Sequence, residues 1–191
     1  MAIAAVRPAA PDDVAEIVRI QATTWEAAYA ELVPPGALAQ LRSPQAERAW
    51  TEAIGAGPGF HVLVATEGEW TVGFCAVTPA QAPEGHTPPG ETDARPVIGP
   101  EQWAEIGVLL VEPRWGRRGH GGRLLATAAL ALREAGALFG LAWVPEADAA
   151  SRRFYERAGW EPDGAARVLD TGDGTIREIR ITGSLDLKLA D

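Results

Sequence analysis

The fold of this chain is indicated first by residues 108–125, which read VLLVEPRWGRRGHGGRLL. The apolar run at the start is typical of a strand, and Pro113 ends it because proline cannot donate to a sheet ladder. Four glycines fall within positions 116–122, and a helical pattern follows them. Glycines let the backbone turn tightly and let a ligand approach closely. The free amides at the start of the helix then predict an anion site.

Positive charge gathers at this glycine-rich loop. Four arginines surround it in a chain whose formal net charge is −9, namely Arg114, Arg117, Arg118 and Arg123. Such a concentration favours a phosphate-bearing ligand, with a solvated basic turn as the alternative. A Walker loop is excluded because no Lys-Ser/Thr pair follows the glycines. A dinucleotide fingerprint is excluded because Leu124 stands where it needs glycine or alanine.

The composition indicates a single globular domain over residues 1–191, since 47% of the residues are apolar and 23% charged. No apolar run approaches the length of a membrane span and the first residues do not open a signal peptide, so we expect a cytoplasmic protein without a membrane partner. One cysteine and three scattered histidines predict neither an internal disulfide nor a bound metal. The acidic balance argues against a nucleic-acid partner and weakly favours a cationic acceptor.

Apolar spacing and turn residues predict an alternation of strands and helices. Strands are expected at 2–7, 61–65, 70–78, 103–111 and 138–144, helices at 11–32, 44–55, 124–135 and 148–158, and a hairpin within 166–181. Residues 79–101 contain six prolines and three glycines. They predict a long loop, which is either a lid over a site or a disordered spacer.

Residues 141–160, LAWVPEADAASRRFYERAGW, resemble the Leu-x-Val…Asn-x-x-Ala-x-x-Phe-Tyr-Glu-x-x-Gly-Phe segment of the GNAT acetyltransferases. Asp148 stands where Asn is usual, and Ser151 where Ala is usual. The glycine-rich loop is similar to the family pattern Arg/Gln-x-x-Gly-x-Gly/Ala, with Gly116 at its first position. Residues 25–29, followed by Val33-Pro34, resemble a subgroup of these enzymes. The resemblance implies an α/β (α+β) GNAT acyl-CoA N-acyltransferase fold, a mixed sheet of about six or seven strands flanked by about four helices.

The resemblance also implies acetyl-CoA as the co-substrate. The end of the strand would offer backbone groups to the pantetheine arm, and the loop amides would cradle the pyrophosphate, with Arg117, Arg118 or Arg123 adding charged hydrogen bonds. The residues implied in binding the cofactor are Leu109, Leu110, Val111, Arg117, Arg118, Gly119, His120, Gly121, Gly122, Asp148 and Phe154. His120 has an alternative interpretation as an ordinary loop histidine.

Two residues are candidates for the chemistry of acetyl transfer. Tyr155 matches the tyrosine that many family members use as a proton donor, and a core tyrosine is the alternative. Proton transfer from a phenol of pKa ~10 to a thiolate near ~8.5 is uphill by roughly 2 kcal/mol. Glu105 is the candidate base, directly or through water, because strict alternation places it on the same strand face as Leu109 and Val111. A structural or acceptor-binding carboxylate is the alternative for Glu105.

Trp25 and Tyr29 would line the acceptor pocket if the first helix lies as in the family, although their helical spacing also suits a core. We therefore predict an N-acetyltransferase that acts on a primary amine of a small molecule or of a protein or peptide, and we expect the homodimer common in the family. Two alternatives stay open. The chain is either a non-catalytic acyl-CoA sensor or a toxin-neutralising or assembly protein that uses the fold as a scaffold.

Overall fold

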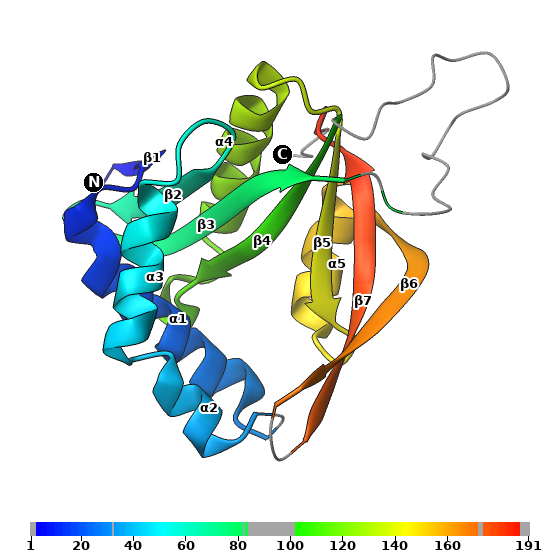
Figure 1. The fold of residues 1–191 in the computed structure, drawn as a ribbon. Helices are drawn as coiled ribbons and strands as arrows, with labels where there is room; N and C mark the ends of the chain where they lie inside the picture. Colours follow the sequence, from blue (N-terminus) through cyan, green and yellow to red (C-terminus); the bar gives the residue numbers. More distant parts are fainter. Residues whose placement is uncertain (1–2, 32, 82, 84–101, 172–173, 188–191) are drawn as a thin grey trace, which may run out of the picture.

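The computed structural model describes residues 3–31, 33–81, 83, 102–171 and 174–187. They form a seven-stranded mixed sheet in the order β1-β2-β3-β4-β5-β7-β6 (Figure 1). The strands are β1 (Ala4–Pro8), β2 (His61–Glu67), β3 (Trp70–Ala80), β4 (Trp103–Val111), β5 (Phe139–Pro145), β6 (Glu161–Asp170) and β7 (Thr175–Ser184). The helices are α1 (Val14–Tyr29), α2 (Pro35–Gln40), α3 (Pro44–Ile54), α4 (His120–Glu134) and α5 (Ala149–Arg157). Short 3-10 turns span Pro11–Asp13 and Pro113–Trp115.

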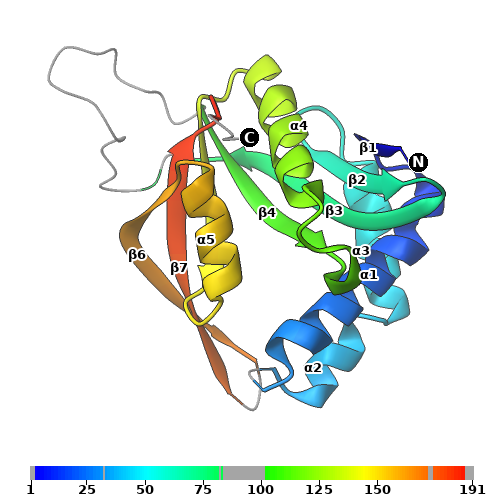
Figure 2. The same cartoon turned by 180° about the vertical axis from the view of Figure 1, so that it is seen from behind.

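The helices cover the two faces of the sheet in separate groups. Helices α1, α2 and α3 lie on one face, and α4 and α5 lie on the other (Figures 1 and 2). The first group encloses a core around Ile17, Val64 and Phe74. The second encloses a larger core around Leu125 and Trp160. This layered mixed sheet is the fold class that the sequence predicted.

The N-terminal helices differ in detail from the prediction. The helix expected from residue 11 begins with a 3-10 turn, and α1 proper starts at Val14. No helix was predicted between residues 32 and 44, but Pro35 opens α2, because proline is well tolerated in the first turn. Helix α3 begins after Ser43, whose hydroxyl accepts from the Ala46 amide at 3.2 Å, and it ends before Gly55 as predicted.

The proline-rich segment predicted at 79–101 begins within a strand, since Pro79 and Ala80 belong to β3. Of the rest, only residues 81 and 83 are described. The predicted lid or spacer therefore lies outside the described residues.

Strand β4 contains a bulge that changes which side chains share a face. Ala76 pairs with Val108, and the next residue of β3 pairs with Ile106, so Gly107 is an extra residue. Ile106 and Leu109 consequently both belong to the core beneath α4. Glu105 lies on the opposite face, together with Val108. The predicted placement of Glu105 on the face of Leu109 and Val111 is wrong, because one extra residue reverses the alternation.

Strands β4 and β5 pair in parallel over only three positions. The pairs run from Trp103 with Phe139 to Glu105 with Leu141. Beyond Glu105 the two strands diverge (Figure 1). The edge of β4 from Ile106 to Val111 therefore has no strand partner on that side among the described residues. Such an edge offers free backbone donors and acceptors to a ligand.

Candidate active site

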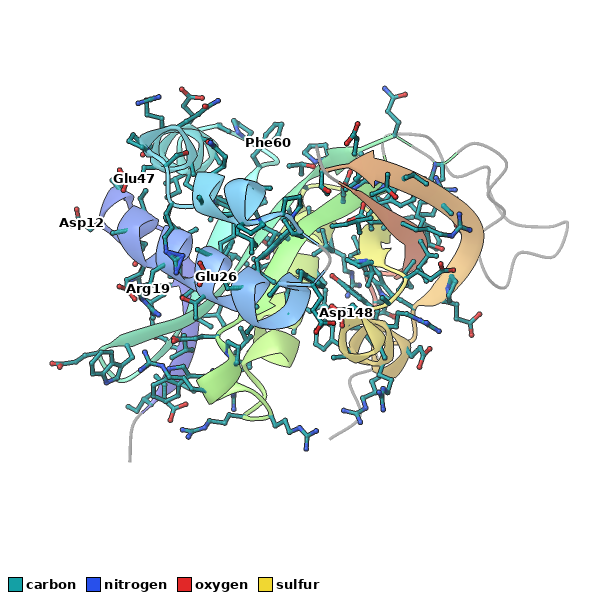
Figure 3. The ribbon with its side chains drawn as sticks, turned by 90° about the horizontal axis from the view of Figure 1, so that it is seen from below. Asp12, Arg19, Glu26, Glu47, Phe60 and Asp148 are labelled. Atoms are coloured by element: carbon teal, nitrogen blue, oxygen red, sulfur yellow. The ribbon has the colours of Figure 1, made fainter. Side chains whose placement is uncertain are left out.

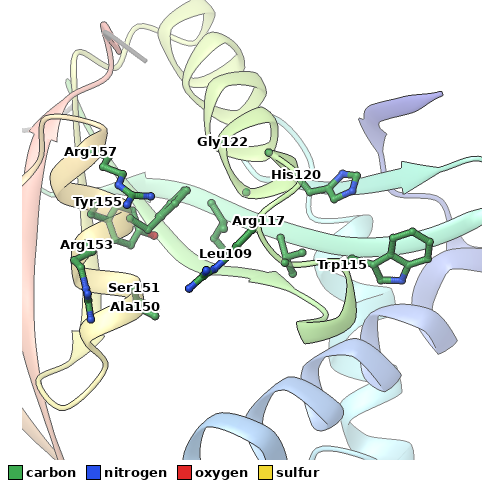
Figure 4. Close-up of a pocket in the computed structure, with 15 residues that line it drawn as sticks. Leu109, Trp115, Arg117, His120, Gly122, Ala150, Ser151, Arg153, Tyr155 and Arg157 are labelled. Atoms are coloured by element: carbon green, nitrogen blue, oxygen red, sulfur yellow. The ribbon is translucent and has the colours of Figure 1, made fainter. Parts of the chain in front are cut away.

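A pocket of about 810 Å³ opens where β4 meets the N-terminus of α4 and the side of α5 (Figure 4). Its walls come from Leu109, Val111, Trp115, Gly116, Arg117, Gly119, His120, Gly121, Gly122, Ala150, Ser151, Arg153, Phe154, Tyr155 and Arg157. The structure thus brings together most residues that the sequence assigned to the cofactor. Leu110, Arg118 and Asp148 are not among the lining residues, nor are Glu105, Trp25 and Tyr29.

The glycine-rich loop presents a row of free amides to the pocket. Gly119 caps α4 with a left-handed φ of 82°, and the first helical bond runs from the Arg123 amide to the Gly119 carbonyl at 3.1 Å. The amides of residues 120–122 therefore precede the helical ladder and have no backbone partner among the described residues. Arg117 is the only non-glycine residue with positive φ (62°) among those described. Strained backbone is common at ligand sites, and free amides at a helix N-terminus are suited to bind an anion.

Side chains behind the loop hold it in place. The Nε2 atom of His120 lies 2.8 Å from Glu67 Oε2, and Arg118 donates to Glu67 Oε1 at 3.1 Å. Arg123 donates to the Arg118 carbonyl at 3.0 Å, and the Arg118 guanidinium stacks on Trp115. His120 is thus a buried brace rather than an ordinary loop histidine. Its Nδ1 is buried and makes no hydrogen bond to the described residues. Arg118 and Arg123 are likewise engaged in supporting the loop.

Three arginines line the pocket, and none of its lining residues is acidic. Arg117 points from the loop toward α5 (Figure 4). Arg153 and Arg157 come from α5, and sequence reasoning missed both. Their spacing of four residues, which places both side chains on one face of a helix, was the available signal. Arg117 and Arg157 make no ion pair with the described residues, so their charges are available to an anion.

Two adjacent glycines at the start of α4, Gly121 and Gly122, have different roles in shaping the pocket. A Cβ at Gly121 would lie 3.2 Å from the Phe154 ring, so the absence of a side chain lets α4 approach α5 closely. A Cβ at Gly122 would meet no atom within 4 Å, because this residue faces the open pocket. Gly121 therefore serves packing, and Gly122 leaves room for a ligand.

Residues 21–160 match the model of the acetyltransferase (GNAT) family. The chain belongs to this family. Its prediction as an acetyl-CoA-dependent acetyltransferase is thereby confirmed at the level of the family. No curated protein sequence matches the chain.

Solved structures show the same fold at low identity. The PaiA N-acetyltransferase of Thermoplasma acidophilum, solved with coenzyme A, is 15% identical, with a TM-score of 0.68 over 95% of this chain and 99% of its own. YncA of Salmonella typhimurium, solved with its cofactor acetyl-CoA, is 21% identical, with a TM-score of 0.67 over 96% and 94%. The ribosomal-protein-alanine N-acetyltransferase of Brucella melitensis is 21% identical, with a TM-score of 0.68 over 94% and 99%.

Within the described residues, no group of histidine, cysteine or carboxylate side chains is arranged to hold a metal. None of the described helices is long and apolar enough to cross a membrane.

Tyr155 of the acetyltransferase lines the pocket from α5 and is almost fully buried. Its ring stacks on Trp160 at a centroid distance of 5.3 Å and meets the edge of Phe154 at 5.1 Å. Burial raises the pKa of Tyr155 well above its ordinary value, and the neighbouring Cys75 adds to the effect. Burial also raises the pKa of the Cys75 thiol to about 12. The phenol is therefore neutral and able to donate a hydrogen bond at physiological pH.

Glu105 is the last residue of β4 that pairs with β5, at the point where the two strands separate. Its side chain lies on the sheet face opposite α4 and α5, as the bulge at Gly107 requires. The carboxylate is half-buried and makes no hydrogen bond or ion pair with the described residues.

Asp148 connects the start of α5 to helix α1, which lies on the opposite face of the sheet. Its Oδ1 accepts from the amides of Ala150 and Ser151 at 3.0 Å each, which caps α5. Its Oδ2 accepts from the Tyr29 hydroxyl at 2.6 Å and the Ser151 hydroxyl at 2.7 Å. Burial opposes the charge on Asp148, but these hydrogen bonds outweigh it and hold the pKa below its usual range. Both oxygens of Asp148 are thus hydrogen-bonded to protein groups, although the sequence assigned this carboxylate to cofactor binding.

Tyr29 joins helix α1 to the start of α5 through this bond (Figure 3 labels Asp148). It is buried in a small core with Val33 and Leu38, and the ring of Trp25 packs against its edge at 5.2 Å. Burial, and then the bond to Asp148, raise the pKa of Tyr29. Tyr29 therefore has the core environment that the sequence left open as an alternative to an acceptor pocket.

Proposed function

We propose that this acetyltransferase moves the acetyl group of acetyl-CoA to a primary amine by direct attack on the thioester. The observation that carries the proposal is the pocket at the N-terminus of α4. Free amides, three unopposed arginines and an unpaired strand edge meet there around about 810 Å³. This combination suits a ligand with a phosphate end and an amide-containing arm.

The donor would bind in two parts. The amides of residues 120–122 hold the pyrophosphate, with Arg117 and the two arginines of α5 adding charge. The pantetheine arm runs along Leu109–Val111 and hydrogen-bonds to the edge that β5 leaves unpaired. Coenzyme A in the Thermoplasma structure and acetyl-CoA in the Salmonella structure support this assignment.

In the chemical step, the neutral amine attacks the thioester carbonyl and the carbon–sulfur bond then breaks. The amine loses a proton, and the departing thiolate gains one, so that the products are an amide and free coenzyme A. Tyr155 donates a hydrogen bond to the sulfur as negative charge develops. Because its pKa is raised, the phenol stabilises the thiolate chiefly as a donor and gives up its proton only in a concerted exchange.

Glu105 receives the proton from the acceptor on the opposite face of the sheet. Carboxylates are in general much weaker bases than amines, so a water molecule relays this proton toward solvent. The absence of any ion pair to Glu105 among the described residues leaves its charge free to attract an ammonium group.

Calorimetry with acetyl-CoA, followed by a thiol-release assay over an amine library, tests the proposal. We expect binding, and release with at least one class of amine. Arg117→Gln should weaken binding, whereas Arg177→Gln should not, because Arg177 lies on β7 away from the pocket and pairs with Glu146. Binding of acetyl-CoA without thiol release for any amine would favour the non-catalytic acyl-CoA sensor. An absence of binding would remove the proposed function.

A further inference from the structure

Two arginines and a tryptophan form a cluster on the sheet face opposite the pocket. Trp143 of β5 pairs directly with Arg180 of β7, and Arg167 extends from the neighbouring β6. The Arg167 guanidinium carbon lies 4.4 Å from the centre of the Trp143 ring, and that of Arg180 lies 5.6 Å away. Both guanidinium groups are thus stacked against one indole, which fixes their planes.

Each arginine of the cluster pairs with one carboxylate through its Nε atom. Arg167 donates through Nε to Glu178 at 2.6 Å, and Arg180 donates through Nε to Asp163 at 2.7 Å. In each pair the carboxylate is the more deeply buried side chain. The exposed fraction is 10% for Glu178 and 42% for Arg167. It is 7% for Asp163 and 16% for Arg180. The terminal nitrogens of both arginines make no hydrogen bond to the described residues. They are therefore available as forks for a planar anion.

This face also carries Glu105. Glu105 of β4 pairs with Leu141 of β5. Trp143 lies two residues after Leu141 on β5, so all three side chains share one face of the sheet. Ideal strand spacings separate the α-carbons of Glu105 and Trp143 by roughly 8 Å, and the divergence of β4 and β5 widens this distance. A carboxylate that attracts an ammonium group and an arginine cluster that attracts an anion thus lie on the same face.

The helices on this side leave the cluster outside their cores. The core beneath α1 and α3 gathers residues of β2, β3 and β4, and the core at the end of α1 reaches β7 only at Ile176. Trp143, Arg167 and Arg180 belong to neither core. Figure 3 shows the two sides, with α1 and α2 on one and β6 and β7 on the other.

We infer that the acceptor is a small amine that also carries a carboxylate, as amino acids do, and that Arg167 and Arg180 bind this carboxylate beside Trp143. The inference rests on the proposed function and adds the substrate class. Glu105 faces the amine, which orients its nitrogen toward the point where β4 and β5 separate. The arginines thereby select the acceptor and take no part in bond making.

Matched acceptors test the inference by thiol release. The probes are the twenty common amino acids, each with its methyl ester and its decarboxylated amine. We expect at least one amino acid to exceed both derivatives by about 10- to 100-fold in kcat/KM, the usual effect of a charged hydrogen-bonding pair. Esters or simple amines that react as well as the acid would overturn the inference. So would acetylation of a polyamine or of O-phosphoethanolamine while all amino acids stay inert.

Variants separate binding of the carboxylate from stability. Arg167→Gln should reduce kcat/KM for the acid toward that of its ester and leave the ester unaffected. Arg180→Gln combined with Asp163→Asn removes the second guanidinium and also removes the charge of Asp163, the carboxylate that pairs with Arg180. Arg177→Gln is the matched control, because it removes an exposed, paired arginine from the same strand β7. An equal loss for acid and ester would contradict selection by the arginines. Calorimetry with acetyl-CoA on each variant shows separately whether the donor site has survived.

Discussion

Gly122 occupies the third position of α4, and a methyl group there would meet no protein atom within 4 Å. If its amide binds the pyrophosphate, that empty space belongs to the ligand. Gly122→Ala should therefore stabilise the free protein and weaken its binding of acetyl-CoA. The two effects have opposite signs and separate causes.

The expected magnitudes follow from the local geometry. Alanine is favoured over glycine within a helix by about 0.5–1 kcal/mol, which raises the Tm of a chain of this size by roughly 1–4 °C. The methyl group would displace a phosphate oxygen from at least one amide. A hydrogen bond to a charged group contributes about 1.5–3 kcal/mol, so the Kd for acetyl-CoA should rise about 10- to 100-fold.

Thermal unfolding of the free protein gives the first quantity, and calorimetry with acetyl-CoA gives the second. Gly36→Ala is the matched control, because Gly36 lies in the first turn of α2 with no atom within 4 Å of an added Cβ and is not a pocket residue. It should raise the Tm without changing the Kd. An unchanged Kd for Gly122→Ala, together with a raised Tm, would refute the placement of the pyrophosphate on this turn.

Other predictions concern the second wall of the pocket and the core. Tyr155→Phe should lower kcat by about 100-fold and leave the Kd for acetyl-CoA nearly unchanged, and an equal kcat would remove the phenol from the mechanism. Asp148 has a lowered pKa, so its charge stabilises the fold above about pH 4, and this contribution is lost as the pH falls through the folded-state value. Asp148→Asn should cost about 1 kcal/mol in urea unfolding at pH 7, and a difference that does not shrink in acid would contradict this account. Gly183→Ala should destabilise by about 2–3 kcal/mol, because its methyl group would overlap the Trp160 indole, and an unchanged Tm would show that the ring can move away.

The elements nearest the site were predictable because local signals define them. The strand 103–111 and the helix after the glycine-rich loop are confirmed, since an apolar run, a left-handed Gly119 and a helical pattern follow one another directly. The start of α5 was equally readable, because an aspartate that caps a helix bonds to amides two and three residues ahead. Each of these features depends on residues close together in the chain.

The sequence by itself determined the family, the order of the elements and the position of the glycine-rich loop, because spacing and backbone propensity act over short separations. Only the tertiary structure decided which way Glu105 faces, since a single extra residue at Gly107 reverses the alternation. A glycine within a strand is compatible with a bulge but does not require one, so the pairing with β3 had to settle it. The bonds of Tyr29 to Asp148 and of His120 to Glu67 join residues 119 and 53 positions apart. Such contacts depend on how strands and helices pack together, and packing is a property of the whole fold.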